Sequence, residues 1–181
     1  MTAFEITSIF ESFCSEHGLS IRLNWNMPFG YETAYGTYDV TINTLFLNLA
    51  LLENAPKYEI LFYLFHELRH AMQYLHPQDF AEEIQSSRFY VILYNGICYK
   101  LINLEWRGCE IEGDEEYWTN AYLGLPYEQD ANKYAYEQAQ KHCGVTDKLT
   151  ELYNFWKPAK ELPYSEYQTI FSKIDSTITS I

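Results

Sequence analysis

The chain has 181 residues, of which 48% are hydrophobic and 18% aromatic, so it can bury a substantial core and is not of disordered composition. Its 25 acidic residues outnumber the 12 basic ones, giving a formal charge of -13 that repels phosphate backbones and anionic lipids. We therefore expect neither nucleic acid nor a membrane as partner. The apolar runs are too short to span a bilayer and the N-terminus lacks a basic secretory segment, which favours a cytoplasmic protein.

Residues 1–53 are predicted to form one helix followed by strands. Apolar residues recur at helical spacing over 3–17, and Gly18 is a plausible stop. The alternation of apolar and polar residues over 20–26 is typical of a half-buried strand. A further apolar pattern over 37–48, interrupted near Asn43, predicts an antiparallel hairpin.

A long helix is predicted over about 54–76. Asn54 is a good N-cap, Pro56 fits a first helical turn, and Pro77 ends the pattern. Beyond it we treat the chain as the rest of a single domain, residues 1–181, with a mostly helical C-terminal half. The elements expected there are helices at 79–94, 127–142, 146–157 and 164–178, a strand at 99–106, and an acidic segment at 110–116.

The segment FHELRH on the helix over 54–76 carries an HExxH motif, formed by His66, Glu67 and His70. Residues four apart lie on one face of an α-helix, separated by about 6 Å along its axis, so two imidazoles can converge on one metal ion. Glu67 is offset by about 100° around the helix, which places its carboxylate beside the metal rather than on it.

This pattern predicts a zinc hydrolase. Neutral histidines leave zinc enough positive charge to activate water near neutral pH, and Glu67 can take a proton from that water as general base. We expect one Zn²⁺ per chain, a protein or peptide substrate, and hydrolysis of peptide bonds. The alternative is a non-catalytic regulatory or binding module in which zinc is structural, although such a site has no need of Glu67.

The third metal ligand has several candidates. His76 follows His70 by six residues, as in the metzincins, but a metzincin has glycine three residues after the second histidine, where this chain has Gln73. If the helix continues through Gln73, His76 points away from the metal. Carboxylates of the acidic segment are further candidates; these are Glu110, Glu112 and Glu116.

The segment PYEQDANKYA at 126–135 resembles the second motif of the ImmA/IrrE-type zinc peptidases, approximately E-x-x-A-N-x-F-A, with Tyr134 in place of phenylalanine. That resemblance covers chiefly residues 38–76 and 126–138. It implies an α+β, zincin-like fold in which a small antiparallel or mixed sheet packs on the active-site helix. It also implies that Glu128 is the third ligand, completing a gluzincin-like His, His, Glu set.

Three further residues are candidates for roles around the metal. Asn132 lies one turn after Glu128 and is placed to brace a ligand through a hydrogen bond. Tyr127 and Tyr134 are the tyrosines nearest the motif that could stabilise an oxyanion. The hairpin over 37–48 is a candidate edge for an extended substrate, because an edge strand offers unpaired backbone groups.

Overall fold

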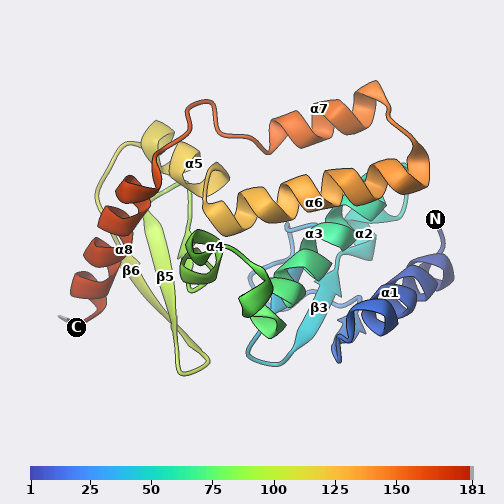
Figure 1. Ribbon diagram of the computed structural model, residues 1–181, viewed down its shortest axis with the longest axis horizontal. Helices are drawn as coiled ribbons and strands as arrows, with labels where there is room; N and C mark the ends of the chain where they lie inside the picture. The colour runs from blue at the N-terminus through green and yellow to red at the C-terminus, as the bar shows by residue number, and fades with distance from the viewer. Residues whose placement is uncertain (180–181) are drawn as a thin grey trace. The chain divides into compact units, whose positions relative to one another are not determined.

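The structure, a computed structural model, describes residues 1–179 and contains two units (Figure 1). Unit 1 comprises Met1–Pro77 and Ala131–Phe155, and unit 2 comprises Gln78–Asp130 together with the chain from Trp156 onward. No helix in the described part of the chain is both long and apolar enough to cross a membrane.

Unit 1 begins with helix α1, Ala3–His17, which confirms the predicted helix. Thr2 caps it: the Thr2 hydroxyl accepts from the Glu5 backbone N–H, and the Glu5 carboxylate accepts from the Thr2 backbone N–H. Gly18 ends the helix with φ 64°, a left-handed conformation that glycine adopts without steric cost.

A three-stranded sheet follows, formed by β1 (Arg22–Asn24), β2 (Gly36–Asp39) and β3 (Thr44–Leu47). The strand order is β1-β3-β2, with β1 parallel and β2 antiparallel to the central strand. The predicted hairpin is confirmed, but its first strand ends earlier than its apolar residues suggested. Val40 and Ile42 lie in the turn, which Asn43 closes with φ 50°.

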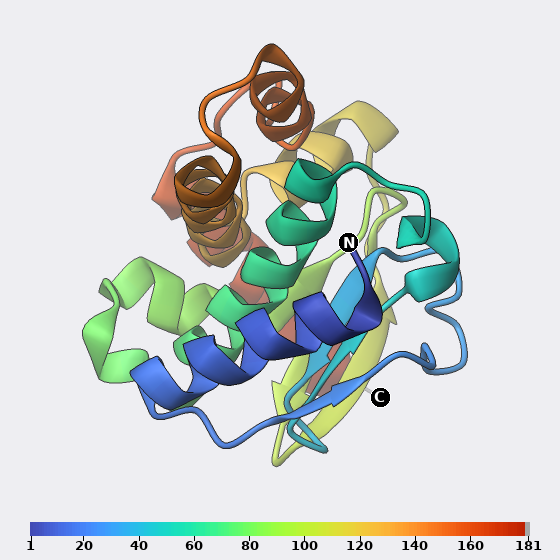
Figure 2. The same cartoon turned by 90° about the vertical axis from the view of Figure 1, so that its right-hand side faces the viewer.

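The long helix of unit 1 is α3, Lys57–Leu75, and it packs against β2 and β3 (Figure 1). Its N-cap is Pro56, not the predicted Asn54, because a short helix α2 (Leu49–Leu52), capped by Asn48, uses the preceding residues. The apolar residues from Ile60 to Phe65, together with Leu68 and Ala71, are buried, whereas Leu75 at the end of the helix is exposed. Figure 2 looks at α1 with α3 behind it. The two helices meet where the Phe13 and Phe65 ring centroids lie 5.8 Å apart.

Helices α6 (Pro126–Cys143) and α7 (Asp147–Phe155) form a helical hairpin and confirm two predicted helices. Figure 1 shows them running alongside each other. Their contact includes a stacked pair of rings, Tyr136 and Tyr153, with centroids 4.5 Å apart. The turn between them begins at Gly144, with φ 74°.

Unit 2 corrects the prediction for residues 79–106. In place of one helix over 79–94 the chain forms a 3₁₀ turn (Pro77–Asp79), a short helix α4 (Glu82–Ser87) and strand β4 (Tyr90–Ile92). The expected strand over 99–106 is a hairpin of two strands, β5 (Ile97–Ile102) and β6 (Glu105–Glu110), in the antiparallel order β4-β5-β6.

Helix α8 (Tyr164–Thr179) packs against β5 and β6 (Figure 1) and confirms the predicted last helix. Helix α5 (Glu115–Leu123) was not predicted. It starts within the acidic segment, where the Asp114 carboxylate accepts from the backbone N–H groups of Glu116 and Tyr117. The protein is thus of mixed α+β class, with two small sheets and a largely helical C-terminal half.

Candidate metal centre

The two histidines of the HExxH motif lie one turn apart on α3 and face each other. The His66 Nε2 and His70 Nε2 atoms are 2.9 Å apart, and the two rings are perpendicular, with centroids separated by 4.5 Å. His70 is buried and His66 is half-buried. The helix therefore presents two imidazole nitrogens to the same point in space, as the motif predicts.

Gln73, one turn further along α3, determines which ring nitrogen of His70 carries the proton. Its Oε1 atom lies 2.8 Å from His70 Nδ1, and its side chain is 1% exposed. Because an amide oxygen can only accept, Nδ1 carries the proton and Nε2 is left with its lone pair. A histidine that binds metal through one nitrogen generally donates from the other in this way. Nothing in the HExxH pattern predicts this role for Gln73, which only the helical spacing i, i+3 from His70 could have indicated.

The geometry of the pair suits a metal ion. Two lone-pair nitrogens this close repel each other unless a proton or a cation lies between them. Ligands bound at 2.0–2.1 Å in a tetrahedral site are about 3.3 Å apart, close to the 2.9 Å between His66 Nε2 and His70 Nε2.

Glu128 completes a group of three residues that could hold a metal ion. Ligand atoms of His66, His70 and Glu128 all lie within 4.8 Å of one another. Glu128 is half-buried in the first turn of α6. Two imidazoles and one carboxylate form a donor set typical of catalytic zinc sites.

The other candidate ligands are not in this group of described residues. His76 is the C-cap of α3, where the helix has continued past Gln73, as the helix-forming character of that residue predicts. Glu110 ends β6, while Glu112 and Glu116 are exposed or lie in the first turn of α5.

Glu67 is buried beside the edge strand β2, with 6% of its surface exposed. A Cβ atom added to Gly36, the first residue of β2, would lie 2.9 Å from Glu67 Cγ, 3.3 Å from Glu67 Oε1 and 3.2 Å from the Phe46 carbonyl oxygen. A side chain larger than glycine at position 36 would therefore push against the carboxylate. The strand and the HExxH helix approach each other this closely only because residue 36 is glycine.

The remaining candidates have different surroundings. Asn132 is buried on α6, one turn after Glu128, and its bracing role stays a prediction. The Tyr134 ring lies 4.5 Å from the Arg69 guanidinium carbon, in a cation–π contact. Tyr127 is buried in the hydrophobic core of unit 2, so its ring serves packing.

Comparison of the chain with known protein families, with curated proteins and with solved structures finds no match.

Proposed function

We propose that the protein is a zinc-dependent metallopeptidase with a zincin-like fold, related to the ImmA/IrrE-type peptidases that its two motifs resemble. The observation that carries the proposal is the group formed by His66, His70 and Glu128, with the Glu67 carboxylate adjacent in sequence and buried on the same helix. A site that only holds structure has no need of a carboxylate in that position.

Zinc is the metal that this donor set favours, because two imidazole nitrogens and one carboxylate leave a tetrahedral ion one open position. When bound, zinc supplies a Lewis acid that polarises the scissile carbonyl and lowers the pKa of water. Gln73 orients His70 for binding by holding its Nδ1–H. His66, His70 and Glu128 would hold the ion, and Glu67 is left for proton transfer.

Glu67 acts as general base and then as general acid in this proposal. Its carboxylate takes a proton from the attacking water and returns that proton to the leaving amine when the peptide bond breaks. Gly36 lies so close to Glu67 that a Cβ there would be 2.9 Å from Glu67 Cγ, and this approach of β2 restricts the positions open to the carboxylate. Such restriction favours catalysis, because proton transfer depends on a fixed geometry.

The substrate strand is proposed to bind along β2. This strand is paired on one side only, to β3, among the described residues. It begins at Gly36, next to Glu67, so a chain paired with β2 would run past the general base. Backbone pairing of this kind binds an extended peptide with little dependence on its sequence.

The test is a comparison of zinc-loaded wild-type protein with Glu67→Gln on a pool of quenched fluorescent peptides. We expect Glu67→Gln to bind zinc stoichiometrically and to hydrolyse peptides at least about 100-fold more slowly. Glu59→Gln, on the first turn of the same helix, is the control and should hydrolyse like wild type. Equal hydrolysis by Glu67→Gln and wild type would refute the role of Glu67 as general base. A wild-type protein that takes up no zinc would refute the proposed zinc-dependent activity.

A further inference from the structure

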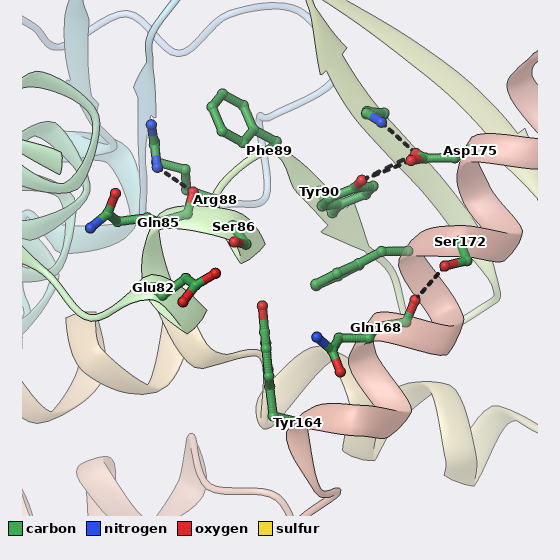
Figure 3. A pocket seen from close by; sticks show the side chains of 12 residues that line it. Glu82, Gln85, Ser86, Arg88, Phe89, Tyr90, Tyr164, Gln168, Ser172 and Asp175 are labelled. Atoms are coloured by element: carbon green, nitrogen blue, oxygen red, sulfur yellow. Dashed lines mark hydrogen bonds and ion pairs between the residues drawn. The ribbon is translucent and has the colours of Figure 1, made fainter. Parts of the chain in front are cut away.

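Unit 2 has a pocket of its own, formed by α4, the strands β4 and β5, and α8 (Figure 3). Its volume is about 580 Å³, and it opens to solvent. Aromatic rings form much of its wall, and two of them, Tyr90 and Phe171, stack with centroids 4.1 Å apart. No role in the proposed peptidase reaction involves any residue of this pocket.

The cations of the pocket already have partners within the chain. Lys100 Nζ lies 2.6 Å from Asp175 Oδ1, and the Tyr90 hydroxyl donates to the same carboxylate at 3.1 Å. The Arg88 guanidinium lies over the Phe89 ring, 4.2 Å from its centroid, and donates to the Gln85 carbonyl. One carboxylate of the pocket, Asp175, is thereby neutralised by Lys100.

The second carboxylate of the pocket, that of Glu82, is not neutralised in this way. Among residues 1–179 it forms no hydrogen bond and no ion pair, and it is exposed at the start of α4. Figure 3 shows its carboxylate on the same side of α4 as Ser86, with the Tyr164 hydroxyl of α8 pointing toward both. The side chains of Ser86 and Tyr164 also have no hydrogen-bond partner in the described part of the chain.

This set of groups suits a planar cation that donates several hydrogen bonds. A carboxylate and two hydroxyl oxygens are acceptors, and the Tyr164 ring offers an aromatic surface beside them. A guanidinium group pairs with a carboxylate through two parallel N–H donors and stacks on aromatic rings, whereas an ammonium does neither in the same way. The formal charge of -13 also attracts basic ligands.

We propose that the pocket binds an arginine side chain of a polypeptide partner, with the guanidinium paired to Glu82 and lying against Tyr164. Because the pocket is open, the side chain can enter while the main chain of the partner stays outside. The proposal does not depend on the metal centre, since none of the residues that line the pocket is His66, Glu67, His70 or Glu128.

The experiment titrates ¹⁵N-labelled full-length protein, without added zinc, with N-acetyl-L-arginine amide and follows the backbone amide signals. We expect saturable shifts confined to α4, β4, β5 and α8, with a dissociation constant in the millimolar range. N-acetyl-L-citrulline amide has nearly the same shape but no charge, and should bind about ten-fold more weakly. Equal binding of the two amides, or shifts outside these elements, would overturn the proposal.

Two variants on the same helix turn sharpen the test. Glu82→Gln should weaken binding of the arginine amide about five-fold, because it removes the ion pair. Glu83→Gln removes the same charge one residue away, outside the pocket lining, and should bind like wild type. If both variants weaken binding equally, the attraction is general to the acidic surface and the pocket is not the site.

Discussion

At the scale of single residues, the candidate metal centre depends on how each ligand is held. Gln73 accepts from His70 Nδ1 at 2.8 Å, which leaves Nε2 for the metal. We expect Gln73→Ala to weaken zinc binding about 10- to 100-fold, because His70 loses the partner that fixes its ring. Competition with a chromophoric chelator measures this change.

The control for that prediction is Gln73→Glu, which keeps an acceptor oxygen in the same place. It should bind zinc far more tightly than Gln73→Ala does. If Gln73→Ala instead binds zinc as wild type does, the hydrogen bond to His70 has no role in metal binding.

Gly36 is the second residue on which the site depends. In Gly36→Ala the new Cβ would lie 2.9 Å from Glu67 Cγ, so the carboxylate must shift. We expect this variant to keep its zinc and to lose about 100-fold in peptide hydrolysis, since a displacement of about 1 Å has such an effect on a catalytic group. An unchanged rate would show that Glu67 has room to move without consequence.

At the scale of elements, the hairpin of β5 and β6 contains a strained turn. Leu104 has φ 63° after Asn103 with φ 52°, and a left-handed conformation is unfavourable for leucine. Leu104→Gly produces the Asn-Gly pair that such two-residue turns prefer. We expect it to raise the free energy of unfolding by about 1 kcal/mol, measured by urea denaturation.

The opposite effect on stability is expected for a substitution in the turn between β4 and β5. Gly96 has φ 80°, and a Cβ there would lie 2.4 Å from the Ile111 carbonyl oxygen. Gly96→Ala should therefore lower the urea midpoint. A stabilising effect of Gly96→Ala, or a destabilising effect of Leu104→Gly, would mean that these turns differ from the structure described.

The elements also show what local sequence can predict. Helix α1 has a capping residue at each end, α6 lies between Pro126 and Gly144, and α8 follows Pro163, so each was predictable within a few residues. Residues 79–94 carry helical spacing too, but Tyr90–Ile92 pairs with β5, and that pairing depends on contacts distant in sequence. Local propensity is overridden where such a pairing buries apolar side chains.

The residues of the candidate site also differ in whether the local sequence predicts their roles. His66, Glu67 and His70 are predictable because their spacing is short and lies on one helix. Glu128 comes from a different helix and was suggested by a resemblance, not by spacing. The roles of Gln73 and Gly36 depend on packing between α3 and its neighbours, which the pattern of residue types does not encode.

At the scale of the whole molecule, burial keeps three of the four cysteines unreactive. Burial raises the pKa of Cys14 to about 11 and that of Cys98 to about 12, and it also raises the pKa of Cys109. At pH 8 only about one in a thousand Cys14 side chains would be thiolate, even with full access. Iodoacetamide should therefore label the native protein at Cys143, which is half-buried, and label all four only after denaturation.

Mass spectrometry of the labelled peptides checks that prediction at pH 8 and again at pH 10. Labelling of Cys14 should rise with pH, because the thiolate fraction grows as the pH approaches its raised pKa. Rapid native labelling of Cys98 at pH 8 would contradict the packing of unit 2.

The central claim is that His66, His70 and Glu128 bind one zinc ion together. The most direct measurement is an anomalous-difference map at the zinc absorption edge, from crystals of the protein grown with zinc. We expect one strong peak per chain, about 2.0 to 2.2 Å from His66 Nε2, His70 Nε2 and a Glu128 carboxylate oxygen. A map with no peak between the two imidazoles, or with the ion bound by His76 in place of Glu128, would contradict it.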